Sequence, residues 1–177
     1  VTNYMETPPN PLSSRSRGDL PTGFLTNDRD PKAYLDSVSS RGSTYKGFNL
    51  IVANKTNCCY YGNRAGTPRE LGKGYYGLSN RILDCDWPKV IEGRTRLTEI
   101  ISAFEDPSEA LFSLLLNQGD DRKFSSSFIA ADTYGTRATT VVLIGTDGEV
   151  VLEERNFGAH GNPLKSNRFQ FNCGDGS

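Results

Sequence analysis

Three polar side chains stand where an extended segment is predicted to meet a loop: Asn3 in VTNY, Asn80 in YGLSN and Arg137 in TYGTRATT. Such borders are where scaffolds display working groups. An asparagine amide can donate a hydrogen bond to a developing oxyanion, and an arginine fork can orient a carboxylate or a nucleophile. Asn is also common in turns and Arg in surface ion pairs. We treat the three as candidate catalytic residues.

A nucleophile with its own base is not visible in the sequence. His160 is the single histidine and lies in FGAHGNP, which predicts a loop, so a Ser–His–acid triad would have a poorly placed base. The cysteines, Cys58, Cys59, Cys85 and Cys173, include no CxxC pair, which argues against a zinc site or a compact disulfide scaffold. We expect free thiols that are buried or half-buried, with a Cys58/Cys59 redox pair as the alternative.

Length and composition predict one ordinary globular domain. The 177 residues are enough for one core, and we assign 1–172 to a single domain and 173–177 to a tail. The net charge of -1 gives no electrostatic argument for binding nucleic acid or an anionic membrane. No apolar run approaches the length of a membrane span. The Pro- and Ser-rich stretch 5–19 predicts a loop that leads into a helix.

The elements predicted in the first half are two short helices and a set of strands. Asp19 and Asp30 are the predicted N-caps, each followed by a proline near the first turn. The apolar side of the second helix consists of Tyr34, Leu35 and Val38, and Gly42 is predicted to end this helix. Residues 48–53 and 58–61 predict a hairpin, and 72–80 (GKGYYGLSN) a third strand.

Two consecutive helices and then strands are predicted in the second half. Residues 86–107 form the clearest helix, and Asp106 begins another over 108–118 in a capping-box-like start. The apolar stripe of the first comprises Val90, Ile91, Leu97, Ile100, Ile101 and Phe104. Strands are predicted at 124–132, 139–144, 150–154 and 167–173, the middle two forming a hairpin. The order of elements predicts an α+β fold.

Burial is also predicted for the strands of this half. Residues 141–144 are apolar throughout, so we expect cover on both faces, while the partner strand alternates and is expected to be half-exposed. Phe169 and Phe171 are predicted to share one face of the last strand.

Several stretches together resemble a known family. VTNY, SRGDLP, YKGFNLIVAN, YYGNR, YGLSN with DCDWPK, and YGTRATTVVLI with GEVVLEER occur in this order along nearly the whole chain. They resemble the NRDE family, whose animal member is named for transport and Golgi organisation, and the spacing resembles its shorter bacterial form. Family members begin with Met-Cys and carry an Asn-Arg-Asp-Glu motif ahead of the segment matching Val1. We therefore expect this chain to be a C-terminal portion, and we interpret NDRD at 27–30 as a loop and helix cap.

The resemblance implies a fold and roles for the candidate residues. The family is similar to N-terminal-nucleophile hydrolases of the choloylglycine hydrolase type, which implies an αββα sandwich of two antiparallel sheets, incomplete here. In that superfamily an N-terminal Cys attacks an amide with its own α-amine as base, so no histidine is needed. By resemblance, Asn3 is the oxyanion Asn, Asn80 the second active-site Asn, and Arg137 the residue that orients the nucleophile region. Without that Cys the chain is expected to be inactive.

The resemblance also implies a cargo. Family members are implicated in intracellular haem trafficking and in lipid homeostasis, so haem is the expected cargo and no cofactor is required. The sequence offers only His160, Met5 and the cysteines as axial ligands. Four tyrosines allow two interpretations: they line an apolar cleft, or they are ordinary strand residues. They are Tyr60, Tyr61, Tyr75 and Tyr76.

Two further functions stay open beside haem handling. One is a linear-amide hydrolase acting on an acyl-amide, and the other is a non-catalytic binding or assembly module. The thiols and the bacterial-type spacing predict a cytoplasmic location, with the mitochondrion or the Golgi as the alternative in a eukaryote.

Overall fold

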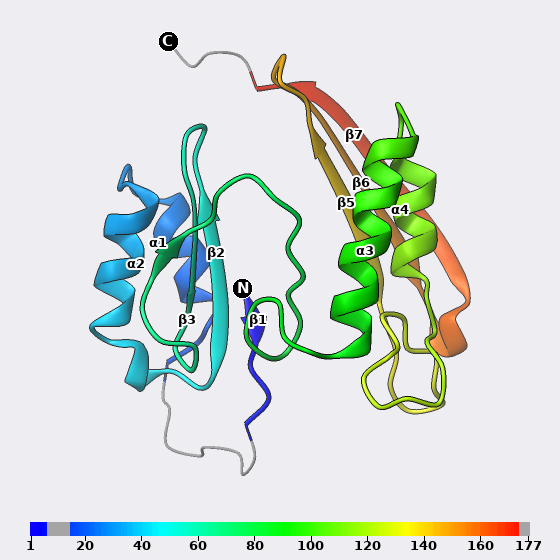
Figure 1. Cartoon of the computed structure of the whole chain (residues 1–177), viewed down its shortest axis with the longest axis horizontal. Coiled ribbons are helices and arrows are strands. Elements are labelled where there is room, and N and C mark those ends of the chain that lie inside the picture. The colour runs from blue at the N-terminus through cyan, green and yellow to red at the C-terminus, as the bar shows by residue number, and fades with distance from the viewer. Residues whose placement is uncertain (7–14, 174–177) are drawn as a thin grey trace. The chain divides into compact units, whose positions relative to one another are not determined.

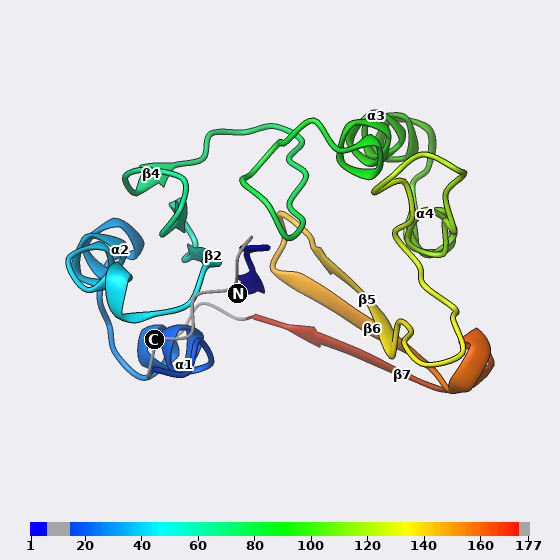
Figure 2. The ribbon, with the colours of Figure 1, turned by 90° about the horizontal axis from the view of Figure 1, so that it is seen from below.

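A computed structural model describes residues 1–6 and 15–173 of the chain (Figures 1 and 2). The middle of the predicted Pro- and Ser-rich loop and the end of the predicted tail lie outside the described residues. The chain divides into two compact units, Val1–Asp86 (unit 1) and Trp87–Ser177 (unit 2). Each unit has its own antiparallel sheet and its own helices, and each is described by itself.

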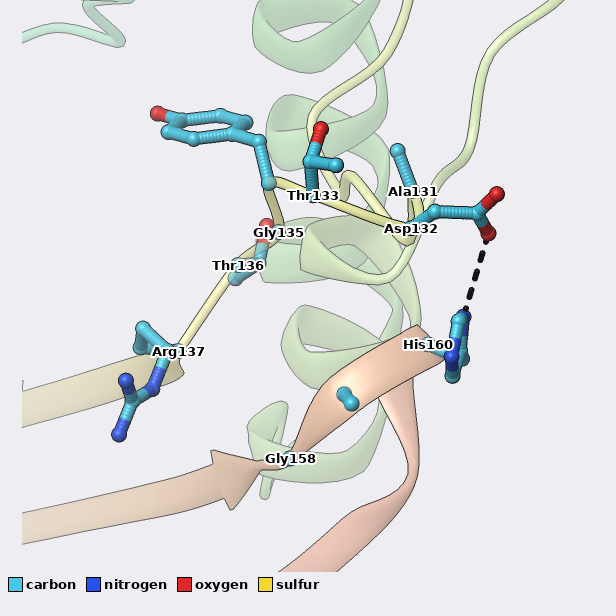
Figure 3. Close-up of a pocket in the computed structure, with 10 residues that line it drawn as sticks. Ala131, Asp132, Thr133, Gly135, Thr136, Arg137, Gly158 and His160 are labelled. Atoms are coloured by element: carbon cyan, nitrogen blue, oxygen red, sulfur yellow. Dashed lines mark ion pairs between the residues drawn. The ribbon is translucent and has the colours of Figure 1, made fainter.

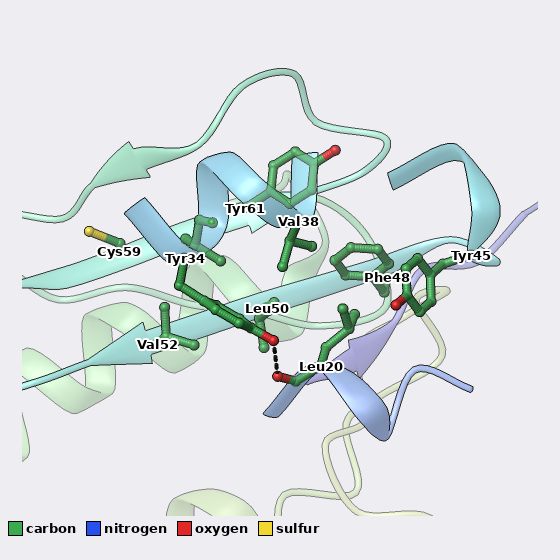
Figure 4. Packing of buried hydrophobic residues seen from close by; sticks show 10 residues of the cluster. Leu20, Tyr34, Val38, Tyr45, Phe48, Leu50, Val52, Cys59 and Tyr61 are labelled. Atoms are coloured by element: carbon green, nitrogen blue, oxygen red, sulfur yellow. Dashed lines mark hydrogen bonds between the residues drawn. The ribbon is translucent and has the colours of Figure 1, made fainter. Parts of the chain in front are cut away.

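Unit 1 packs two helices on one face of a four-stranded sheet with the order β1-β2-β3-β4. Its elements are β1 (Thr2–Asn3), α1 (Asp19–Leu25), α2 (Pro31–Ser39), the short 3-10 helix η1 (Gly42–Thr44), β2 (Phe48–Ala53), β3 (Cys58–Gly62) and β4 (Arg69–Glu70). The core between helices and sheet, shown in Figure 4, consists of Leu20, Tyr34, Leu35, Val38, Tyr45, Phe48, Leu50, Val52, Cys59 and Tyr61.

Local chemistry explains why α2 begins where it does. Asp30 Oδ1 accepts hydrogen bonds from the backbone N–H groups of Lys32 and Ala33, at 2.9 and 3.1 Å. Once formed, the helix buries the predicted apolar side, and the Tyr34 hydroxyl donates to the Leu20 carbonyl at 2.6 Å (Figure 4). The predicted cap and the predicted hairpin are both confirmed.

Three predictions for unit 1 are wrong. Residues 72–80 form no strand, because three glycines interrupt them; β3 instead pairs with the short β4. The cap of α1 is Gly18, and Asp19 is the first helical residue. Helix α2 ends at Ser39, so the glycine predicted to end it begins the 3-10 helix η1 instead.

Unit 2 pairs two helices with a three-stranded sheet in the order β5-β6-β7. Its elements are α3 (Pro88–Ala103), α4 (Ser108–Leu115), β5 (Ala138–Ile144), β6 (Glu149–Phe157), the short 3-10 helix η2 (Ala159–Gly161) and β7 (Pro163–Asn172). Arg155 of β6 forms an ion pair with Glu109 of α4, and its guanidinium carbon lies 3.7 Å from the centre of the Phe112 ring. Glu153 accepts hydrogen bonds from Arg155 at 2.9 Å and Arg168 at 3.0 Å. Arg155 therefore links α4 to the sheet, and Glu153 connects Arg155 with Arg168 within the sheet.

The helices and the first predicted strand of unit 2 differ from expectation. Residues 124–132 form no strand, and only an isolated bridge joins Ala130 to Gly135. On α3, Val90 and Ile100 are buried, but three members of the predicted stripe are exposed: Ile91, Ile101 and Phe104. Leu97 is half-buried, so the covered side of α3 consists of Val90, Leu97 and Ile100 and is narrower than the predicted apolar stripe. Helix α4 begins at Ser108, as predicted, and the Asp106 carboxylate accepts the Ser108 N–H at 3.0 Å, but the helix ends at Leu115 and not at residue 118.

Strand β5 of unit 2 is less buried than the sequence predicted. Val141 is buried, but Val142 and Ile144 are 49% and 73% exposed, so β5 is covered on one face only. Phe169 and Phe171 do share one face, as predicted, and their exposed fractions are 57% and 49%.

Taken together, the described residues form an α+β fold with two antiparallel sheets, as predicted. None of the helices in this described part of the chain combines the length and hydropathy that crossing a bilayer requires.

Candidate functional site

Asn3 lies at the end of β1, the edge strand of the unit 1 sheet. It pairs with Phe48 of β2, and its side chain is exposed. The strand stops there: the next residue, Tyr4, donates its N–H to the Gly47 carbonyl at 2.9 Å, outside the ladder. The predicted strand–loop border is therefore present, with an amide side chain at its surface.

Asn80 lies in a closed loop, where the sequence predicted the end of a strand. The ends of this loop are joined by Asp84, whose N–H donates to the Gly77 carbonyl at 2.8 Å and whose carboxylate accepts from the Gly77 N–H at 2.7 Å. Asn80 stands between them and is exposed. A loop closed in this way presents its middle residues to solvent.

A buried asparagine ties this loop to the sheet. Asn49 of β2 is fully buried, and its amide donates to the Arg81 carbonyl at 2.7 Å and, at 3.5 Å, to that of Ser79. Its carbonyl oxygen accepts from the Tyr60 hydroxyl at 2.7 Å, and that hydroxyl accepts from the Leu83 N–H at 3.2 Å. Burial raises the pKa of Tyr60, which keeps the hydroxyl protonated and able to donate. These bonds fix the backbone on both sides of Asn80.

The same network brings the segments of Asn3 and Asn80 together. The Met5 N–H donates to the Asn80 carbonyl at 2.7 Å, and the Thr2 hydroxyl donates to the Ser79 carbonyl at 3.3 Å. The two candidate asparagines therefore stand on neighbouring, hydrogen-bonded stretches of unit 1. Exposed amide groups in such a position can donate hydrogen bonds to a ligand oxygen.

Sequence reasoning missed Asn49, and it considered Tyr60 only as a residue of a cleft or of an ordinary strand. A signal was present, since Asn49 is a polar residue in the otherwise apolar strand FNLIVA. A buried amide must find partners, so such a position predicts a network.

Arg137 belongs to unit 2 and directly precedes β5. Its carbonyl accepts the Phe157 N–H at 2.9 Å, which holds the backbone against β6, while its side chain is exposed. Within residues 1–6 and 15–173 its guanidinium forms no ion pair. It is thus available to an anionic group of a ligand.

Arg137 lines a pocket of about 380 Å³ in unit 2, shown in Figure 3. His160 lies on the opposite side of this pocket, with Nδ1 3.5 Å from an Asp132 oxygen. Tyr134 contributes a ring that is 71% exposed. The pocket, here called the His160 pocket, thus combines an imidazole, a guanidinium and an aromatic ring.

The thiols do not gather into a reactive or metal-binding cluster. All four are free, with Cys58 half-buried, Cys59 and Cys85 buried, and Cys173 exposed. Burial raises the pKa of Cys58 and of Cys59, which disfavours the nucleophilic thiolate at the adjacent pair. In the part of the chain that the structure describes, no group of three or more His, Cys, Asp or Glu side chains is arranged to hold a metal ion.

The four tyrosines do not form one cleft. Tyr60 and Tyr61 are adjacent in β3, so they point to opposite faces of the sheet, and both are buried. Tyr75 and Tyr76 lie in the loop before Asn80 and are partly exposed.

Comparison with known proteins places these residues in context. Residues 1–159 match the profile of the family described as Transport and Golgi organisation 2, a range that includes Asn3, Asn80 and Arg137. Three relatives align over 185 residues, which cover 88% of this chain and 67% of each relative. They are the Transport and Golgi organization 2 homolog of Mus musculus, at 34% identity, and the Transport and Golgi organization protein 2 homologs of Bos taurus and Homo sapiens, at 35% and 34%.

Proposed function

Because this chain belongs to the transport and Golgi organisation 2 family, we propose that it binds haem and passes it on within the cell. The resemblance of its motifs to the NRDE family implies this cargo. The observation that carries the proposal is the His160 pocket, which gathers an exposed imidazole, an exposed tyrosine ring and an arginine.

Each side chain of this pocket suits one part of haem. Nδ1 of His160 faces Asp132, so Nε2 would be the atom available to bind the haem iron. Arg137 can pair with a propionate, and the ring of Tyr134 can lie against the macrocycle. Since the imidazole is 60% exposed, the complex would be open on one side, which favours handing haem on over permanent retention.

Haemin titration followed at the Soret band tests this function. We expect a saturable shift in the wild type and its loss in His160→Ala, while Arg137→Gln weakens binding without changing the spectrum. The matched controls are Met5→Ala and Cys173→Ala, which remove the other exposed candidate ligands. Because His160 lies just beyond the residues of the family match, its role is argued from this chain alone. No saturable shift in the wild type would end the haem proposal, and an unchanged shift in His160→Ala would end the assignment of the pocket.

A second candidate function is amide hydrolysis, and the paired segments of Asn3 and Asn80 favour it. By resemblance these asparagines would hold the oxyanion of an amide under attack by an N-terminal Cys. Each unit provides one helix layer and one antiparallel sheet, the layers that an αββα sandwich of the N-terminal-nucleophile type would use.

The first test of hydrolysis is N-terminal sequencing with intact mass on the protein from its source. A terminal Cys followed by an Asn-Arg-Asp-Glu motif would justify assaying a panel of acyl-amides. In that assay Cys→Ala should abolish turnover, and Asn80→Ala should lower kcat by roughly 10²–10³-fold if it donates to the oxyanion. A different first residue would exclude this mechanism. A protein that neither shifts the Soret band nor turns over amides would be a binding or assembly module.

The compartment is part of the same proposal. We place the protein in the cytoplasm, and fractionation of the source cells tests this against the mitochondrion and the Golgi.

A further inference from the structure

A pocket of about 570 Å³ in unit 1 has positively charged walls. Arg15, Arg17 and Lys46 all line it, and Asn3 lies beside them. We call it the cationic pocket. It lies entirely within unit 1 and shares no residue with the His160 pocket.

The two arginines of the cationic pocket are held by the protein. Arg17 Nη1 donates to the Gly47 carbonyl at 2.9 Å. The guanidinium carbon of Arg15 lies 6.0 Å from the centre of the ring of Tyr45, a residue that is almost fully buried. Since each guanidinium has five N–H donors, most of them remain for a ligand. Anchored arginines lose less side-chain entropy on binding than free ones.

The positive charge of the pocket is not neutralised by ion pairs. Among residues 1–6 and 15–173, no carboxylate forms an ion pair with Arg15, Arg17 or Lys46. The acidic groups nearby are Glu6, which Arg64 holds at 2.6 Å, and Asp19, whose charge acts on Arg15. Three cations against one unpaired carboxylate leave a net positive pocket.

We infer that the cationic pocket binds the diphosphate group of a small molecule. A single negative charge would leave the cluster under-compensated, whereas a diphosphate supplies several. The planar forks of the two arginines match phosphate oxygens, and Lys46 adds a point charge. The pocket volume lies in the range of small-molecule sites, so it has room for more than the diphosphate. This inference depends neither on haem binding nor on amide hydrolysis.

Calorimetric titration of this chain with inorganic pyrophosphate at low ionic strength tests the inference. We expect saturable binding that Arg15→Gln and Lys46→Gln each weaken about tenfold, as loss of one charged hydrogen bond predicts. Lys46→Arg should retain binding because it keeps the charge. The matched control is Arg41→Gln, which removes an exposed charge from the same unit outside the pocket and should bind as the wild type does.

Each other outcome of this titration overturns the inference. An equal loss in Arg41→Gln would mean unspecific attraction to the whole surface. Octanoate serves as the carboxylate probe, and binding of octanoate without pyrophosphate would assign the pocket to a monoanion. Circular dichroism checks that each variant is folded, and Lys46→Gln, which loses no hydrogen bond found in the structure, decides the matter if Arg15→Gln unfolds.

Discussion

The two units attach helices to sheets by different means. In unit 1 the contact is made by aromatic and aliphatic side chains, with Leu20, Leu35, Val38, Phe48 and Leu50 all fully buried. In unit 2, Arg155 of β6 joins α4 to the sheet through an ion pair with Glu109 and a contact with the buried ring of Phe112. Within the sheet, the buried Glu153 of β6 forms ion pairs with Arg155 and with Arg168 of β7. Apolar burial stabilises regardless of pH and is insensitive to screening, whereas ion pairs respond to both. The stabilities of the two units should therefore respond differently to mutation, to pH and to salt.

The largest effect is expected from Phe48→Ala in the core of unit 1. Phe48 is fully buried and packs edge-on against Tyr45 and Tyr61. Its removal should lower the free energy of unfolding by about 3–5 kcal/mol through lost burial and a cavity. Amide exchange of β2 and β3 measures this. The control is Ile51→Ala on the other face of β2, 40% exposed, for which we expect less than about 1 kcal/mol. If the two variants lowered the free energy of unfolding equally, the apolar core would not be what stabilises unit 1.

A smaller effect is expected from Glu153→Gln in unit 2. The buried carboxylate of Glu153 binds Arg155 and Arg168, and the neutral amide should cost about 2 kcal/mol. Added salt should lower the stability of the wild type and narrow this difference. Denaturation followed by the single Trp, Trp87 of unit 2, reports the change. The control is Glu99→Gln, which changes an exposed carboxylate on α3. If the stability difference between the wild type and Glu153→Gln did not depend on salt, the ionic interpretation would be contradicted.

In the network around Asn80, Tyr60→Phe should lower the free energy of unfolding by about 1 kcal/mol. The variant removes the hydroxyl that bonds Asn49 and the Leu83 N–H, so exchange of the Leu83 amide should accelerate. Burial raises the pKa of Tyr60 above its ordinary 10.0. Its contribution is therefore complete below about pH 10 and is lost as the pH rises through the folded pKa. In this pH range the wild type should lose stability more steeply than Tyr60→Phe does. The control variant Tyr134→Phe, which changes an exposed tyrosine, should lose stability as the wild type does.

The smallest effect concerns an exposed ion pair of unit 2. Hydrogen bonds from Arg122 lower the pKa of Asp120 to about 2. The contribution of this pair is present above the ordinary carboxyl pKa of 3.8 and is lost as the pH falls toward 2. Carboxyl NMR should find the midpoint of the Asp120 titration near 2 in the wild type and unchanged in Arg96→Gln. In Arg122→Gln the midpoint should rise but stay below the ordinary value, because the backbone N–H of residue 122 and the Ser125 side chain still bond the carboxylate. A midpoint near 3.8 in the wild type would show that the pair does not form.

The sequence predicted those features whose causes are local. The cap at Asp30 and the hairpins depend on neighbouring residues, and all of them are present. The loop of Asn80 depends on Asn49, some thirty positions earlier in the chain, so residues 72–80 alone could not reveal it. Nor could the apolar run 141–144 reveal that only one face of β5 is covered.

The candidate site shows the same division. Asn3, Asn80 and Arg137 were recognised from their motifs, and their positions at borders and in loops are now described. Their catalytic roles stay predictions. The cationic pocket escaped notice because its residues come from separate stretches, near Asn3, around 15–17 and at Lys46.

The last strand has a consequence for the behaviour of the protein at high concentration. In the described chain β7 is an edge strand of ten residues, with Phe169 and Phe171 exposed on one face. Such an edge is a template onto which another molecule can add a strand. Pro163 lacks the N–H that such addition needs, and the positive charge of Lys165 opposes the approach of a second copy of this edge. Concentrated salt screens that repulsion, so at high protein concentration it should cause the protein to form fibres or to precipitate.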